Sequence, residues 1–149
     1  MGLSIELIEH QLHALRAELF YAYNLDMKKI DEDCIFCKIV ASKIPCQKIY
    51  EDKDFLAFLD INPRSPGHAL VIPKKHYRWV WDVPNAGKYF EVVKKVALAQ
   101  KKSFNVDKII SKIVGEDVPH AHVWIYPDES MKGDKNDLTG NAEKIIKNL

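Results

Sequence analysis

The chain has 149 residues, of which 47% are hydrophobic and 29% charged, a composition typical of one folded domain rather than a disordered or fibrous protein. The 22 Lys and Arg against 21 Asp and Glu give no overall field for nucleic acid or an anionic membrane, so we expect neither as a partner. No segment approaches the roughly 20 apolar residues of a membrane span, and the first residues lack the order of a secretory signal. We therefore expect a cytoplasmic protein.

Residues 1–32 differ from the rest and predict one amphipathic helix, with Ser4 as its N-cap. Apolar residues recur there at alternating spacings of three and four: Ile5, Ile8, Leu12, Leu15, Leu19 and Ala22. Such a stripe either packs on the body of its own chain or pairs with a second copy. His10 and His13 lie on the same helix without a third ligand, so we assign them no metal.

Residues 33–127 read as the main domain, and 128–149 as a polar tail that ends in a short helix at 142–148. Short apolar runs predict strands, in meander order, at 48–50, 55–61, 68–72, 107–114 and 118–126. A helix is predicted between them at 85–104, and a tight turn at 115–117. This order indicates an α+β fold with a largely antiparallel sheet, a central helix and an extra N-terminal amphipathic helix.

Cys34 and Cys37 form a Cys-x-x-Cys pair, which lets two thiolates reach one ion from a single turn of chain. The same spacing serves redox dithiols, but those usually follow a strand, and this pair follows a predicted helix. The spacing therefore favours zinc over a redox pair, with two buried reduced thiols as the third alternative. Further ligands would have to come from Cys46 and the four histidines beyond residue 34.

Two of those histidines, His120 and His122, alternate with Trp124 along a predicted strand, which places all three side chains on one face. Two histidines side by side on a strand next to the core favour a functional role over a satisfied polar residue. The other two are His68, after a Pro-Gly turn, and His76, after Pro-Lys-Lys. Imidazole binds zinc or attacks an electrophile, and either role requires its neutral form.

These segments resemble the histidine-triad (HIT) superfamily of nucleotide hydrolases and transferases, over about residues 33–127. The matching blocks are 34–40 (CIFCKIV), 44–45 (IP), 50–52 (YED), 56–61 (LAFLDI), 66–76 (PGHALVIPKKH) and 120–122 (HAH). Their order is similar to that of the zinc-containing, Hint-like branch. That resemblance implies a HIT-like fold and a structural zinc ion held by Cys34, Cys37, His76 and His120.

The resemblance further implies cleavage of nucleoside 5′-phosphoramidates, dinucleoside polyphosphates or related mixed phosphates. His122 would be the nucleophile that forms a nucleotidyl-histidine intermediate, and His68 would lie beside the phosphate. Phe36, Phe58 and Ile61 would line a purine pocket, and Asp60 would accept hydrogen bonds from the ribose hydroxyls. The same resemblance implies a purine nucleotide or nucleoside phosphate conjugate as partner, and a homodimer.

The sequence departs from the family at two places. The third histidine of the triad falls at Trp124, whose indole has no titratable group and cannot protonate a leaving group. Glu116 and Asp117 replace the usual neutral amide and hydroxyl, and carboxylates repel a phosphate unless they turn away from it. We therefore expect a slow enzyme. The alternative is a catalytically weakened nucleotide-binding or partner-binding protein that retains the zinc.

Overall fold

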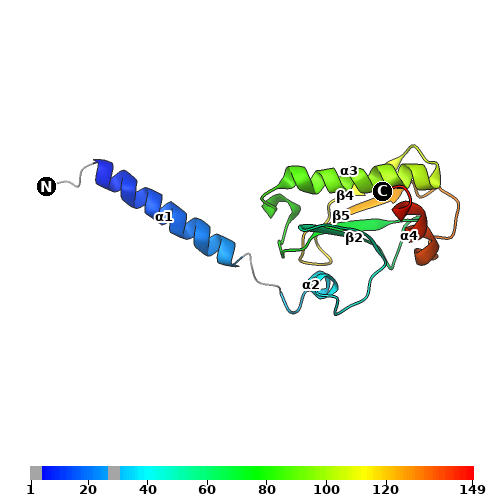
Figure 1. Cartoon of the computed structure of the whole chain (residues 1–149), viewed down its shortest axis with the longest axis horizontal. Coiled ribbons are helices and arrows are strands. Elements are labelled where there is room, and N and C mark those ends of the chain that lie inside the picture. Colours follow the sequence, from blue (N-terminus) through cyan, green and yellow to red (C-terminus); the bar gives the residue numbers. More distant parts are fainter. Residues whose placement is uncertain (1–4, 27–30) are drawn as a thin grey trace.

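The protein folds into a five-stranded sheet with helices on both faces, seen in a computed structural model that describes residues 5–26 and 31–149 (Figure 1). The elements are α1 (Ile5–Asp26), α2 (Ile35–Val40), β1 (Lys48–Glu51), β2 (Phe55–Leu59), β3 (Ala69–Pro73), the 3-10 helix η1 (Val80–Asp82), α3 (Ala86–Phe104), β4 (Ile109–Lys112), β5 (Val123–Pro127) and α4 (Leu138–Ile146). All neighbouring strands are antiparallel. The predicted α+β class is confirmed.

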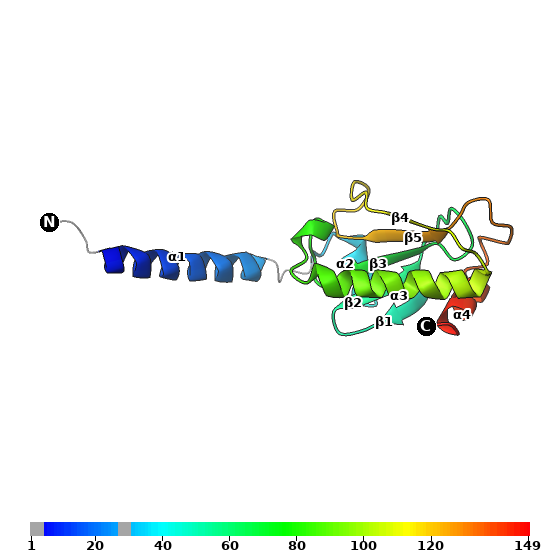
Figure 2. The same cartoon turned by 90° about the horizontal axis from the view of Figure 1, so that it is seen from above.

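The sheet separates two apolar cores, because α3 covers one face and α2 lies against the other (Figures 1 and 2). Alternate residues of β2 point to opposite faces: Ala57 and Leu59 join the α3 core, whereas Leu56 and Phe58 join the α2 core. This double burial explains why β2 and β3 read as continuous apolar runs. Both the metal-ligand candidates and the predicted purine pocket lie on the α2 side.

The sheet order is β1-β2-β3-β5-β4, so the predicted meander holds only for the first three strands. The last strand begins at Val123 rather than at 118, and ten residues (113–122) separate it from β4 in place of a tight turn. Pro119 has no amide hydrogen to give to a strand partner. The backbone N–H of His120 donates to the Val118 carbonyl at 2.7 Å, and that of Ala121 donates to the Tyr77 carbonyl at 2.6 Å. This segment therefore leaves the sheet and points its histidines toward α2.

Two helices, α3 and α4, begin directly after a polar side chain that caps their first turn. The Asn85 side chain accepts a hydrogen bond from the Lys88 amide, so α3 starts at residue 86, close to the predicted position. Asp137 caps α4 in the same way through the Gly140 amide, and α4 therefore begins four residues earlier than predicted. It packs against α3 and β1, with Ile145 fully buried.

The N-terminal helix α1 lies apart from the sheet in both views (Figures 1 and 2). Its apolar stripe is exposed, with fractional exposures of 44–76%. The described members of the stripe are Ile5, Ile8, Leu12, Leu15 and Leu19. Packing of these residues on the chain's own body, the first alternative, is therefore wrong.

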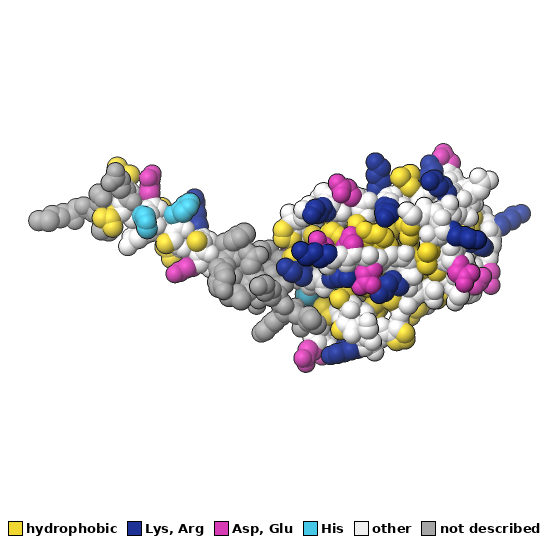
Figure 3. All heavy atoms as spheres, in the orientation of Figure 1, with side chains coloured by type: hydrophobic (Ala, Val, Ile, Leu, Met, Phe, Trp, Pro, Cys, Tyr) yellow, Lys and Arg dark blue, Asp and Glu magenta, His cyan; other side chains and the backbone are white. Residues whose placement is uncertain are grey.

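Histidine side chains lie on the surface of α1 (Figure 3). Ser4 and the side chain of Ala22 lie outside the described part of the chain. Within the described ranges, no helix is long and apolar enough to cross a membrane.

Candidate functional site

Four candidate metal ligands converge between α2 and the sheet. Cys34 is the N-cap of α2, Cys37 lies in that helix, His76 follows β3, and His120 lies in the segment before β5. One ligand atom from each residue lies within 4.8 Å of all the others. The structure thus brings together the four residues that the resemblance implies as ligands, from segments up to 86 positions apart in the chain.

The distances within this group fit one metal ion. The Cys37 Sγ lies 3.3 Å from Nδ1 of His76 and 3.6 Å from Nδ1 of His120, and the Cys34 Sγ lies 3.4 Å from Nδ1 of His120. Thiolate and imidazole ligands at ordinary bond lengths, placed at the corners of a tetrahedron, are separated by about 3.6 Å. The donor set, two sulfurs and two nitrogens, also suits a four-coordinate site.

A backbone contact orients one of these histidines. His120 Nε2 lies 2.9 Å from the Pro73 carbonyl oxygen, which can only accept, so Nε2 carries the hydrogen and Nδ1 is left as the lone pair for a metal. Burial lowers the pKa of His120 to about 4, which keeps the ring neutral. Burial likewise raises the pKa of the Cys37 thiol to about 12, whereas reactive redox cysteines have lowered values. The raised pKa therefore disfavours a reactive redox thiolate, and the convergence of four ligand atoms is what favours a metal.

Beside this group lies a cavity of about 410 Å³ between α2, β2 and the segment before β5. All four predicted nucleotide-binding residues line it, together with the predicted nucleophile: Phe36, Phe58, Asp60, Ile61 and His122. Phe36 and Phe58 meet edge to face, with ring centroids 5.7 Å apart. Ile61 is 77% exposed at the cavity surface. The cavity is therefore lined mainly by apolar side chains, with Asp60 and His122 among its polar ones.

His122 has a defined tautomer. Its Nδ1 lies 2.7 Å from the carbonyl oxygen of His120, so Nδ1 carries a hydrogen, and in the neutral tautomer Nε2 holds the lone pair. The side chain is buried, and the Phe36 ring meets it edge to face at 5.3 Å. A neutral imidazole held by one nitrogen and free at the other is the form that acts as a nucleophile.

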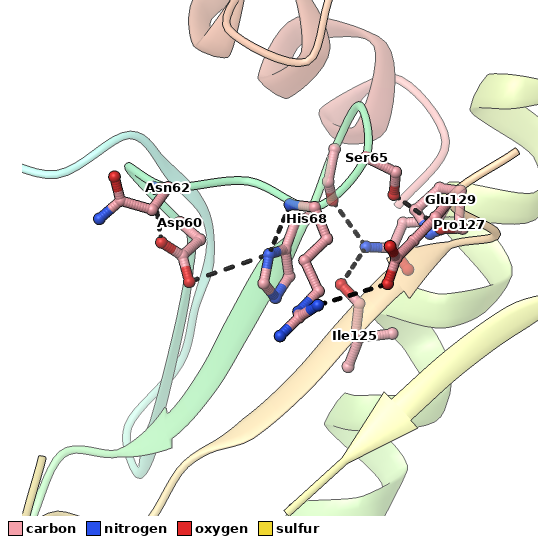
Figure 4. Close-up of polar contacts among 10 residues, drawn as sticks. Asp60, Asn62, Ser65, His68, Ile125, Pro127 and Glu129 are labelled. Atoms are coloured by element: carbon pink, nitrogen blue, oxygen red, sulfur yellow. Dashed lines mark hydrogen bonds and ion pairs between the residues drawn. The ribbon is translucent and has the colours of Figure 1, made fainter. Parts of the chain in front are cut away.

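His68 lies behind the cavity wall rather than on it. It is 1% exposed, and its ring contacts Trp124 at 5.2 Å and Tyr126 at 4.8 Å between centroids. The Arg64 amide donates to its Nδ1 at 3.3 Å, and Asp60 Oδ2 lies 3.8 Å from the same atom (Figure 4). Burial lowers the pKa of His68 to about 4, although Asp60 opposes the shift. His68 is thus a neutral support for the wall of the cavity.

The structure also shows a cavity neighbour that the sequence did not suggest. The Arg64 guanidinium carbon lies 5.4 Å from the centroid of the Trp124 ring, and Trp124 lines the cavity two residues after His122. Arg64 belongs to a turn whose residues predicted only a change of direction, and no sequence pattern relates it to Trp124. Its position depends on how the turn folds back over β5.

The two carboxylates before the histidine segment are both exposed. Asp117 lines the cavity, whereas Glu116 is not among the residues that do. Only Asp117 would therefore lie close enough to repel a phosphate in the cavity, and its exposure to solvent would screen that charge.

Several curated proteins are similar to this chain. An uncharacterized HIT-like protein of Methanocaldococcus jannaschii is 42% identical over 100 residues, which are 63% of this chain and 78% of that one. An adenosine 5′-monophosphoramidase of Saccharomyces cerevisiae is 40% identical over 106 residues, or 69% and 67% of the two chains. An adenylylsulfatase of Arabidopsis thaliana is 34% identical over 111 residues, or 69% and 56%.

Several solved structures are also similar to this chain. A Hit-like protein from Bartonella henselae superposes with a TM-score of 0.72 and 37% identity, covering 80% of this chain and 98% of that one. A Zn-bound histidine triad family protein from Mycobacterium smegmatis superposes with a TM-score of 0.66 and 28% identity, covering 77% and 91%. The family model of the HIT domain matches residues 41–131. With the sheet, the paired histidines and the cavity in place, this chain belongs to the HIT domain family.

Proposed function

We propose that the protein is a nucleotide-binding phosphohydrolase or nucleotidyl transferase in which His122 attacks the α-phosphorus of a nucleoside 5′-phosphate derivative. The carrying observation is the contact between His122 Nδ1 and the His120 carbonyl, because it fixes the hydrogen on Nδ1 and presents Nε2 as a lone pair beside the cavity. The relatives named as an adenosine 5′-monophosphoramidase and an adenylylsulfatase support an adenylyl nucleotide as substrate.

The reaction proceeds in two steps. In the first, the Nε2 lone pair of His122 forms a bond to the α-phosphorus, and the bond from phosphorus to the leaving group breaks with its electron pair on the leaving group. In the second, water attacks the same phosphorus and gives up a proton to solvent, and the phosphorus–nitrogen bond breaks with its electron pair returned to Nε2. An acceptor other than water in this step gives a transferase.

The cavity offers a place for each part of a nucleotide. A flat base fits against Phe36 and Phe58, and Ile61 covers it from the opening. Asp60 Oδ1 accepts from the Asn62 amide at 2.8 Å, which holds the carboxylate. Its Oδ2 faces a neutral His68 and remains an acceptor for the two ribose hydroxyls.

We further propose that the four-ligand group holds a structural zinc ion. Four protein ligands leave no open coordination position for water, so the ion would stabilise the fold rather than activate a nucleophile. It would join the segment before the sheet to the loop after β3 and to His120, whose carbonyl fixes His122. Residues 33–127 would then form the HIT domain, with 1–32 as an extension and 128–149 as a tail.

We also propose a homodimer in which α1 pairs with α1 of a second copy. The alternating three and four spacing is that of a coiled-coil seam. In an antiparallel pair that packs Leu12 against Leu15 of the partner subunit, Glu9 lies opposite Arg16 of the partner subunit, twice by symmetry. We expect Arg16→Glu to reduce helical signal and sedimentation coefficient of the full chain, and Glu9→Arg in the same chain to restore both. Unchanged values in the single variant would contradict this pairing.

The test of the enzymatic proposal is intact-protein mass spectrometry after incubation with adenosine 5′-phosphosulfate or adenosine 5′-phosphoramidate. We expect an adenylyl adduct in the wild type and none in His122→Ala or His122→Gln, with circular dichroism and metal content confirming that both variants fold. An adduct that persists in both variants would assign the nucleophile elsewhere. Nucleotide binding without adduct or turnover would favour the weakened binding protein.

A further inference from the structure

Any leaving group in this cavity faces a shortage of proton donors. The titratable side chains that line the cavity, within the described part of the chain, are Cys46, Asp60, Asp117 and His122. His122 is the proposed nucleophile, the two aspartates accept hydrogen bonds when ionised, and burial raises the pKa of Cys46 so that its thiol holds its proton. Trp124, two residues beyond the nucleophile, has no proton to release. General-acid assistance is therefore weak on this wall.

A cation lies against Trp124, the cavity residue without a titratable group, although Arg64 itself is outside the cavity lining. The Arg64 guanidinium stacks over Trp124 with its carbon 5.4 Å from the ring centroid, on the residue that flanks His122 in the cavity wall. Trp124 is in turn backed by the buried His68 ring. The backbone amide of Arg64 donates to His68 Nδ1 at 3.3 Å, which ties the turn that carries the guanidinium to the same wall.

The guanidinium retains donors for a ligand. One of its nitrogens lies 3.5 Å from a Glu129 carboxylate oxygen, the ion pair drawn on Glu129 in Figure 4. Both side chains are about half exposed, at 43% and 51%, so this pair contributes little energy and is screened by solvent. Arginine has five N–H donors in a planar fork, which matches the oxygens of phosphate or sulfate.

We propose that Arg64 is the specificity-determining residue for the leaving group, so that the protein prefers nucleotide mixed anhydrides with an oxyanion leaving group over phosphoramidates. The inference rests on the proposed function. When the phosphorus–oxygen bond of an anhydride breaks, its electron pair stays on an oxygen of sulfate or phosphate, which departs as a stable anion and needs no proton. The arginine fork stabilises that charge as it develops.

A phosphoramidate places a different demand on the site. When its phosphorus–nitrogen bond breaks, the electron pair stays on nitrogen, and the amine leaves readily only if an acid delivers a proton to that atom. Arginine cannot supply it, because its guanidinium does not deprotonate in proteins. The aspartates in the cavity disfavour an anionic leaving group without a cation nearby, so the anhydride reaction depends on Arg64.

The test compares kcat/KM for adenosine 5′-phosphosulfate and adenosine 5′-phosphoramidate. We expect the wild type to prefer the phosphosulfate by about 10²-fold or more, and Arg64→Gln to lose about 10²-fold on the phosphosulfate alone. Arg64→Lys should retain part of that rate, because it keeps the charge without the fork. Trp124→His should raise activity on the phosphoramidate, because it supplies a titratable group.

Lys95→Gln is the matched control, because the Lys95 ammonium lies 4.6 Å from the Tyr50 ring centroid, and neither of these residues lines the cavity or contacts Trp124. Its substrate ratio should equal that of the wild type. A wild type that cleaves both substrates equally, or an Arg64→Gln that loses equally on both, would overturn the proposal. Absence of an adenylyl adduct with either substrate would instead refute the proposed function, so the two failures are distinguishable.

Discussion

Gln100 connects α3 to segments beside the cavity, and we predict that its replacement lowers the stability of the protein. Its side chain is fully buried on α3, and Nε2 donates to the Gly67 carbonyl at 2.8 Å and to the Ile125 carbonyl at 3.0 Å (Figure 4). Gly67 precedes His68 and Ile125 follows Trp124. One amide group therefore connects α3 to the start of β3 and to β5, two of the several segments that contribute residues to the cavity wall.

Gln100→Leu keeps the size and helix propensity of the side chain but removes both hydrogen bonds. Each buried carbonyl that loses its donor costs about 1.5 kcal/mol. The change also removes Oε1, which has no hydrogen-bond partner among the described residues and returns about 1 kcal/mol when deleted. We expect a net loss of about 2 kcal/mol in the free energy of unfolding, or a fall in melting temperature of roughly 8 °C.

Differential scanning calorimetry with metal-loaded protein measures this change. The control is Lys94→Leu at an exposed position of the same helix, which should shift the free energy of unfolding by less than about 0.5 kcal/mol. An unchanged or higher melting temperature for Gln100→Leu would refute the reasoning, since it would mean that the two hydrogen bonds do not stabilise the native state.

Three further predictions concern the metal group, a buried histidine and a turn. Cys37→Ser should release bound metal and lower the melting temperature, whereas Cys46→Ser, outside the ligand group, should retain one metal per chain by plasma mass spectrometry. In the folded protein His68 has a pKa of about 4, whereas in the unfolded chain it protonates near pH 6.5. The free energy of unfolding should therefore fall as the pH drops from about 6.5 to 4, by up to about 3 kcal/mol. Urea titrations of His68→Gln should lack that part of the slope, and an identical pH dependence would contradict the assignment. Gly67→Ala should destabilise the folded protein by at least about 2 kcal/mol in the same assay, because Gly67 has a φ of +76° and a Cβ there would overlap the Phe104 ring. A smaller loss would show that the turn relaxes.

The sequence by itself determined most elements of the fold and two of the four candidate metal ligands. Period-two burial on both faces of a sheet leaves unbroken apolar runs, so β2 and β3 could be found without coordinates. Apolar residues at alternating spacings of three and four predicted the helix α1, because that spacing places them along one helix face. The Cys34 and Cys37 pair indicated a metal because ligand spacing is a local property. The other two ligands required the family resemblance, since they lie far away in the chain.

Only the tertiary structure decided what depends on contacts between distant segments. The tautomer of His122 follows from one carbonyl, and the late start of β5 follows from hydrogen bonds that pull the histidine segment toward Tyr77. The position of Arg64 over Trp124 depends on the fold of a turn against a strand 60 residues away. Such contacts have no sequence period, because they are set by the packing of whole elements. The apolar stripe of α1 predicts that this helix needs a partner. Only the structure shows that the rest of the chain leaves the stripe exposed.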